Sequence, residues 1–256
     1  MKKNFFGLLV LLIGLVSCNS DHQTKVSFFL TDAPTGMSFE QVNIDIQRVE
    51  YKLGSDSLWE SLPMEPAVYN LLSLTNGTDT LLSNIYLKEG QEIQQIRLVL
   101  GSENNLVMED GSIVALTTPS AQTSGIKMNI HSEANASSGY SVMIDFDAAR
   151  SITKTGSGKY MLKPVIRTYI VQNSSFIDGK ILPDSVAYKV YTVSGTDTIT
   201  TYSDPENANY FMLHGLFSGE YTLTYVHPIT GVAVQSAPQT IIGGADLHLG
   251  AVDLTE

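Results

Sequence analysis

Apolar and polar residues alternate along most of the chain from Lys25 onward, with turn residues at frequent intervals. A period of two residues places alternate side chains on opposite faces of a strand, and hardly any stretch shows the helical period. The segments predicted as strands are VSFFLT (26–31), VNIDIQ (42–47), VEYKL (49–53), QIRLVL (95–100), SIVALT (112–117), IKMNI (126–130), SVMIDF (141–146) and MLKPVIRTYI (161–170). Such short strands, separated by Gly, Asn and Pro, are typical of an antiparallel sandwich or barrel.

Two local departures from simple alternation predict specific features. The apolar period slips by one residue near Gln47-Arg48, which indicates a β-bulge. A single helical turn is expected around Val68 to Leu74, closed by Asn76-Gly77.

The N-terminal residues predict export. Lys2 and Lys3 precede an apolar stretch from Phe5 to Val16, which is shorter than the about 20 residues needed to span a bilayer, so a cleaved signal peptide over residues 1–17 is expected. The following Leu15-Val16-Ser17-Cys18 resembles the lipobox of bacterial lipoproteins, in which the cysteine is acylated and becomes the mature N-terminus. The alternative is an ordinary signal peptide with a chance cysteine. Cys18 is the single cysteine of the chain, which favours the lipoprotein.

Lipidation at Cys18 has consequences for chemistry and location. It would leave no thiol for a disulfide, a metal site or a nucleophile. Asn19 follows, rather than the Asp that marks inner-membrane retention in some lipoproteins, so the outer membrane is expected, on either its periplasmic or its surface face. Residues 18–24 would form a lipidated tether. No cofactor is expected.

The mature chain would be strongly acidic. The full sequence has 15 basic and 26 acidic residues, and loss of Lys2 and Lys3 leaves 13 against 26, a net charge of −13. Such a surface argues against binding to nucleic acid or to anionic lipid. About 240 residues allow one large β domain or two smaller ones.

The chain is expected to divide at VQNSS (171–175), between a first β-sandwich over residues 25–170 and a second over 176–256. In the second, Phe211-Met212-Leu213-His214-Gly215-Leu216-Phe217-Ser218-Gly219-Glu220-Tyr221-Thr222-Leu223 resembles the core of prealbumin-like, carboxypeptidase-regulatory-like sandwiches. Gly215 and Gly219 would permit tight turns in it. That resemblance implies a fold and says little about function.

Five separated motifs of the first region resemble a bacterial family known as domain of unknown function 4382. They are Leu30-Thr31-Asp32-Ala33-Pro34, Ile96-Arg97-Leu98, Gly125-Ile126-Lys127, Asp145-Phe146-Asp147 and Leu162-Lys163-Pro164-Val165-Ile166-Arg167. The family is typical of secreted or lipid-anchored envelope proteins, often ahead of a sandwich of the second kind. The resemblance implies a β fold and an envelope location, and it brings no established activity.

Asp145 and Asp147 are the strongest candidates for chemistry, because residues two apart on a strand share a face. With Asp32 they could form an oxygen-rich calcium site, or act as a catalytic acid and base. The favoured interpretation is structural. Asp147 would cap the turn that follows it, and Asp145 would pair with Arg97 or Arg167 in a polar cluster.

Other candidate motifs are weaker. His22, His131, His214, His227 and His248 show no metal-ligand spacing, and His214 is expected in an exposed turn. Gly156-Ser157-Gly158-Lys159 is expected to be a hairpin turn rather than a phosphate loop, and no Gly-x-Ser-x-Gly motif is present.

Aromatic residues and short acidic motifs suggest two kinds of glycan chemistry. Trp59 is expected in the core rather than on a sugar-binding platform, whereas tyrosines near strand ends could face a glycan or protein; these are Tyr188, Tyr191, Tyr202 and Tyr210. Motifs resembling envelope O-glycosylation acceptors are Asp56-Ser57-Leu58, Asp79-Thr80-Leu81, Asp184-Ser185-Val186 and Asp197-Thr198-Ile199.

The sequence as a whole predicts a non-catalytic, lipid-anchored envelope protein that acts as a binding or adhesion module for a glycan or another envelope protein. The alternative is a fimbrial or pilus-type structural subunit, assembled by strand exchange. A metal-dependent enzyme built on Asp32, Asp145 and Asp147 is the least favoured hypothesis.

Overall fold

The computed structural model describes residues 23–34, 36–54, 58–88, 90–118, 125–130, 139–183, 185–242 and 244–255. The predicted signal peptide, Cys18, His22 and His131 lie outside these residues, as do Asp56 and Asp184 of the acceptor-like motifs. Nearly all the described secondary structure is strand, so the all-β fold class is confirmed. No helix in the described ranges has the length and apolar character needed to cross a bilayer.

One sheet of the first sandwich has the order β13-β10-β1-β5. Its strands are β1 (Gln23–Asp32), β5 (Thr80–Lys88), β10 (Tyr140–Phe146) and β13 (Ile166–Ile170). The N-terminal strand β1 lies inside the sheet, antiparallel to β5 but parallel to β10. The sheet is therefore mixed, whereas a purely antiparallel one was predicted.

The facing sheet is built around the long strand β2 (Phe39–Leu53). Its other strands are β3 (Trp59–Ser61), β4 (Ala67–Asn70), β6 (Ile93–Leu100), β7 (Asn105–Met108), β8 (Ile113–Ala115) and β9 (Ile126–Asn129). The register between β2 and β6 shifts between Ile46 and Arg48, which confirms the predicted bulge. The predicted helical turn is the 3-10 helix η1 (Leu71–Leu74), followed by Asn76 and Gly77 at positive φ.

The core of the first sandwich follows from strand alternation. Val26, Phe28 and Leu30 of β1 are fully buried, as are Val142 and Ile144 of β10, and they pack toward β2 and β6. Below this core, the short helix α2 (Ala148–Ser151) leads into a hairpin of β11 (Ile152–Lys154) and β12 (Tyr160–Leu162). Residues 156–159 form the turn of that hairpin, as predicted.

A second, separate hydrophobic cluster is formed by residues 177–254. After the 3-10 turn η2 (Val171–Asn173), its sheets have the orders β17-β14-β22, β16-β15-β19-β20 and β18-β21. The elements are β14 (Ser175–Leu182), β15 (Lys189–Ser194), β16 (Asp197–Tyr202), η3 (Pro205–Asn207), β17 (Tyr210–Leu216), β18 (Gly219–Tyr221), β19 (Thr224–Val226), β20 (Ala233–Gln235), β21 (Gln239–Ile241) and β22 (Leu247–Asp253). Tyr221, Leu223 and Tyr225 are all buried in this cluster.

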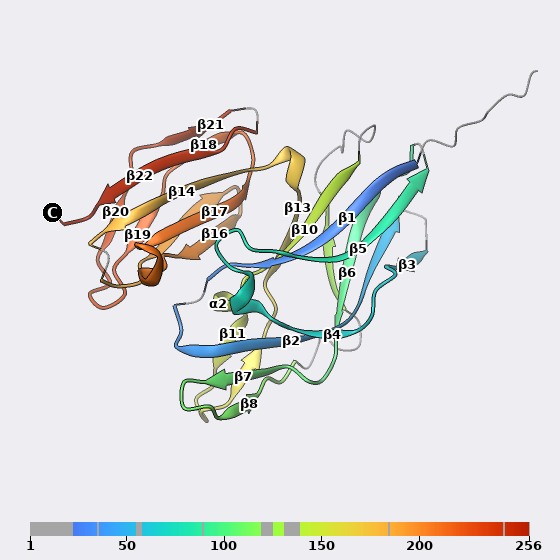
Figure 1. Ribbon diagram of the computed structural model, residues 1–256, viewed down its shortest axis with the longest axis horizontal. Helices are drawn as coiled ribbons and strands as arrows, with labels where there is room; N and C mark the ends of the chain where they lie inside the picture. Colours follow the sequence, from blue (N-terminus) through green and yellow to red (C-terminus); the bar gives the residue numbers. More distant parts are fainter. Residues whose placement is uncertain are drawn as a thin grey trace, which may run out of the picture.

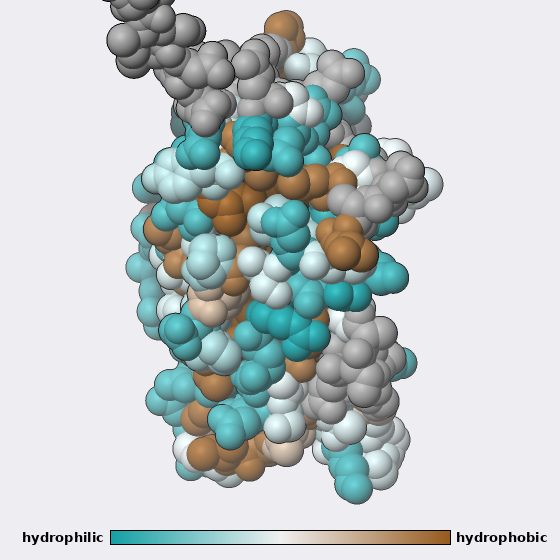
Figure 2. Space-filling view, turned by 90° about the vertical axis from the view of Figure 1, so that its right-hand side faces the viewer, coloured by the Kyte–Doolittle hydropathy of each residue, from teal (hydrophilic) through white to brown (hydrophobic). Residues whose placement is uncertain are grey.

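The two sandwiches lie side by side along the long axis of the molecule (Figure 1). Within the first sandwich, β13 faces the second sandwich and β5 is the outermost strand of its sheet. Within the second, β16 lies nearest the first sandwich and β20 is outermost at the opposite end. Figure 2 looks onto the end that carries β5 and β3, and shows apolar side chains gathered among polar ones in its upper part.

Candidate functional site

Asp145 and Arg167 face each other across the β10–β13 ladder, where they are register partners. The Arg167 Nε–H donates to Asp145 Oδ2 over 2.5 Å. Asp145 is only 3% exposed, so its charge is removed from water and has this guanidinium as its partner.

The same guanidinium reaches across to the second sandwich. Arg167 Nη2 donates to the backbone oxygen of His214 over 2.6 Å and Nη1 to that of Gly215 over 3.3 Å. Tyr169, two residues further along β13, places its hydroxyl 2.5 Å from His214 Nδ1. We call Asp145, Arg167, Tyr169, His214 and Gly215 the junction cluster, because they join β10 and β13 to β17.

Gly215 makes this close approach possible. Its φ is +68°, and a Cβ at this position would lie 2.6 Å from the Tyr169 ring. Only a residue without a side chain fits both the backbone conformation and the space. The glycine lies inside β17, whereas a tight turn was predicted at this position.

His214 is likewise part of β17 and is half-buried, so the prediction of an exposed turn residue was wrong. Burial lowers the pKa of its imidazole, because the charged form is disfavoured away from water. At neutral pH the imidazole is therefore uncharged and hydrogen-bonded to Tyr169. The burial of Tyr169 raises the pKa of its phenol, so the hydroxyl keeps its proton.

Asp147 and Asp32 organise the turn after β10. Asp147 Oδ1 accepts a 2.9 Å hydrogen bond from Arg150 N and so caps helix α2. Asp32 Oδ1 accepts a 2.9 Å bond from Ala148 N. Burial raises the pKa of both carboxyls, and the charge of Asp145 adds to the effect.

Two buried carboxylate oxygens have no hydrogen-bond partner among the described residues, Asp32 Oδ2 and Asp145 Oδ1. Asp32 is fully buried, and this burial raises the pKa of its carboxyl well above the ordinary value, which favours the neutral form. Across the described ranges, no group of three or more His, Cys, Asp or Glu side chains is arranged to hold a metal ion. Asp145 faces an arginine.

Arg97, the other predicted partner of Asp145, lies in the facing sheet. It is the register partner of Glu50 across β2 and β6, and its Nε donates to Glu50 Oε2. Glu50 also accepts a 2.9 Å bond from Arg48. Inclusion of Arg97 in the polar cluster of Asp145 was therefore wrong, because strand pairing places the two residues on different sheets.

Trp59 packs against Arg97 and is not part of the core. It lies half-buried on the short strand β3, with the Arg97 guanidinium 4.4 Å from its ring centroid. The prediction of a core tryptophan was wrong, because β3 pairs with the end of β2 on the outer part of the sheet. Successive contacts thus form a partly exposed chain of four side chains, Trp59, Arg97, Glu50 and Arg48.

A cleft of about 450 Å³ opens beside the junction cluster, between the two sandwiches. The first sandwich contributes Thr31, Asp79 and Met143 to its walls, and the second contributes Phe176, Met212 and Asp246; Tyr169 and His214 lie at its inner side. The walls thus combine apolar and aromatic side chains with polar groups that could orient a ligand. No pattern in the sequence predicts this cleft, because its residues come from six separate segments.

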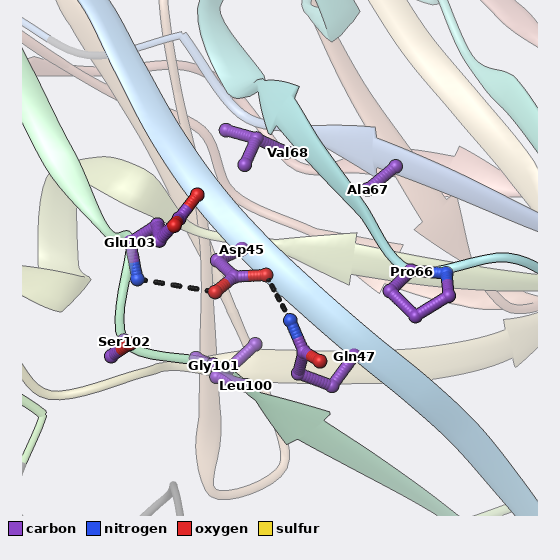
Figure 3. Close-up of a pocket in the computed structure, with 9 residues that line it drawn as sticks. All are labelled: Asp45, Gln47, Pro66, Ala67, Val68, Leu100, Gly101, Ser102 and Glu103. Carbon is purple, nitrogen blue, oxygen red and sulfur yellow. Dashed lines mark hydrogen bonds between the residues drawn. The ribbon is translucent and has the colours of Figure 1, made fainter.

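A wider groove of about 640 Å³ lies on the outer face of β2 (Figure 3). Asp45 forms its floor, between β4 and the loop after β6. Its carboxylate accepts bonds from Gln47 Nε2 over 2.6 Å and from Glu103 N over 3.1 Å. Since both oxygens are already engaged by the protein, the charge of Asp45 serves to hold the loop in place.

The fold and the junction cluster define a class of protein, a pair of β-sandwiches joined by hydrogen bonds from an arginine and a tyrosine of the first to a strand of the second. The chain belongs to the family described as domain of unknown function DUF4382, whose model matches residues 23–164. No functionally curated protein matches it.

Two solved structures show a distant likeness. The major pilin subunit BcpA of Bacillus cereus is 10% identical, with 89% of this chain and 69% of that chain covered and a TM-score of 0.20. A fimbrial protein from Bacteroides ovatus ATCC 8483 is 10% identical, with 91% and 51% covered and a TM-score of 0.22. The chain thus spans about half the length of the second protein. At these scores the likeness carries no argument about function.

Proposed function

We propose that the protein is a non-catalytic binding module of the cell envelope, anchored to the outer membrane through lipid at Cys18. Its ligand, a glycan or a segment of another envelope protein, binds in the cleft between the sandwiches. The observation that carries the proposal is this cleft of about 450 Å³, within the range of ordinary ligand sites.

The junction cluster supports a binding role because it fixes the walls of the cleft. Arg167 and Tyr169 of the first sandwich are hydrogen-bonded to His214 and Gly215 of the second. Binding then costs little free energy for ordering the protein, which favours affinity. Phe176, which is half-buried in the wall of the cleft, provides a ring against which a sugar or an apolar side chain can pack.

The test is a glycan and peptide array probed with the chain from residue 18 onward, carrying Cys18→Ser to prevent acylation. Gln172→Trp would fill the cleft from an exposed position on its rim, and Gln94→Trp is the matched control on an exposed position of β6. We expect binding to fall at least about tenfold in Gln172→Trp, which corresponds to 1.4 kcal/mol, and to be unchanged in the control. Binding that survives Gln172→Trp would place the ligand elsewhere.

The anchor is tested separately in cells. Cys18→Ala is expected to move the protein from the membrane fraction to the soluble fraction and to abolish labelling by a fatty-acid analogue. Retention of the label would contradict lipidation at this residue.

A second candidate function is a structural subunit of a surface filament. The observation that favours it is that two strands toward opposite ends of the molecule, β5 and β20, each pair on one side only within the described residues. Open edges are sites at which another chain can add a strand.

A further inference from the structure

The outer edge of β5 has the properties of a docking strand. Among the described residues β5 pairs with a single strand, β1, so its other edge has no strand partner. Tyr86 on its outward face is 62% exposed, and Leu81 is also exposed. Residues 80–87 contain no charged side chain.

The outer edge of β20 has the same properties. Within the described part of the chain β20 pairs only with β19, and each of its residues is exposed. The turn before it exposes Ile229 and Val232, and Val234 is exposed on the strand itself. Residues 221–245 contain no Asp, Glu, Lys or Arg.

We infer that the partner of each edge is a second copy of this chain, with β20 of one copy docking against β5 of the next. This inference extends the structural-subunit candidate and does not depend on a ligand in the cleft. Such a contact joins different surfaces of the two copies, so both copies keep one edge unused, and the assembly stays open-ended.

The charge distribution limits where two copies of the chain can meet. Two copies that each carry a net charge of −11, or −13 after loss of the N-terminal residues, repel one another over most of their surfaces. Approach costs least where the facing strands carry few charges, and residues 80–87 and 221–245 contain no Asp, Glu, Lys or Arg. Natural proteins usually protect an open edge with charged side chains, and the central parts of these two edges have none.

The positions of the edges also fit a head-to-tail contact. Starting from the junction cluster, β5 is the last strand of its sheet toward one end of the long axis, and β20 is the last strand of its sheet toward the other end (Figure 1). Repetition of one contact therefore extends the assembly along the molecule instead of closing a compact dimer.

The test is sedimentation velocity of the chain from residue 18 onward with Cys18→Ser, over a wide range of protein concentration and at low and high salt. We expect a concentration-dependent series of species larger than the dimer, favoured by salt, because salt screens the repulsion. A single monomeric species at every concentration and salt level would overturn the inference, while leaving the cleft-binding test untouched.

Tyr86→Glu and Val234→Glu each place a carboxylate on one of the two edges. Each variant alone is expected to lose association by tenfold or more. Val193→Glu is the matched control, since Val193 lies on β15 away from both edges and is 59% exposed. Melting temperatures of the three variants are compared with that of the parent to verify folding.

A mixture of the two edge variants distinguishes this contact from a symmetric one. The Tyr86→Glu chain keeps an intact β20 and the Val234→Glu chain keeps an intact β5. Their mixture should therefore form one-to-one dimers that do not grow further. Dimers of either variant alone, no complex in the mixture, or an equal loss of association in Val193→Glu would each overturn the proposed pairing.

Discussion

Arg167 with Asp145 and Arg97 with Glu50 are two arginine–carboxylate pairs across neighbouring strands of the described structure. They differ in what the rest of the guanidinium contacts. The two Nη groups of Arg167 donate hydrogen bonds to backbone oxygens of the second sandwich. Arg97 lies over the ring of Trp59, on the same sheet as its carboxylate. Arg167 therefore connects the two sandwiches, whereas Arg97 contacts residues of its own sheet. The two arginines therefore have different roles, because different groups lie next to the part of each guanidinium that does not contact the carboxylate.

The largest expected difference between the pairs is in stability. Arg167→Ala leaves the carboxylate of Asp145 buried without its partner and removes the bonds to β17, so the free energy of unfolding should fall by about 3–5 kcal/mol. Arg97→Ala leaves the largely buried Glu50 with Arg48 as a remaining partner, so the loss should be smaller, about 1–3 kcal/mol. Calorimetry of both variants makes the measurement. Equal losses would show that the junction cluster has no special role.

Gly215→Ala tests the fit of the junction without changing any charge. The new methyl group meets the Tyr169 ring at a positive φ, so we expect a loss of about 2–3 kcal/mol. Gly111→Ala, at a φ of +76° with open space around it, provides the control for backbone strain alone. If both substitutions cost the same in urea-unfolding experiments, contact with Tyr169 contributes nothing.

Asp32 and Glu50 should give opposite pH dependence. The pKa of Asp32 is raised by burial above its ordinary 3.8, so its contribution to stability is complete below that pH and is lost as pH rises through the raised value. For Glu50, burial alone would raise the pKa, but the bonds from Arg97 and Arg48 outweigh it and lower the pKa below 4.5. Its contribution is present above 4.5 and is lost as pH falls through the lowered value.

The measurement is the free energy of unfolding from pH 3 to pH 7 for the parent, Asp32→Asn and Glu50→Gln. The range spans the ordinary pKa values of both groups. Relative to the parent, Asp32→Asn should gain stability as pH rises, and Glu50→Gln should lose it. Parallel curves for the two variants would contradict the assignment.

The smallest expected effect is that of calcium. Because Asp145 contacts Arg167 and Asp147 caps helix α2, the melting temperature should not change when calcium is added. Asp145→Asn and Asp147→Asn, made separately, should melt lower than the parent with or without the ion. A calcium-dependent rise in the parent that either variant abolishes would restore the metal hypothesis.

Local features were predictable because they depend on neighbouring residues. Alternation identified the principal strands, the period slip at Gln47-Arg48 located the bulge, and Asp147 was recognised as the residue that caps the following turn. In each case a few consecutive side chains determine the outcome.

Features that depend on strand pairing were not predictable. Nothing near Arg97 or Arg167 in sequence shows which of them faces Asp145, because the answer depends on the register of distant strands. Glu50 and Tyr169 carried no motif and were missed. Gly215 was read as a turn residue because a glycine needed for close approach looks the same in sequence as one needed for a turn.

The position of β1 inside its sheet also determines how the molecule resists force. A pull on the N-terminal end of β1 acts along the strand, parallel to the ladders with β10 and β5. The hydrogen bonds of both ladders lie across that direction, so they are loaded together rather than opened one after another. A protein held by its N-terminus would therefore bear tension through a central strand that is paired on both sides, with the core residues Val26, Phe28 and Leu30 sharing the load.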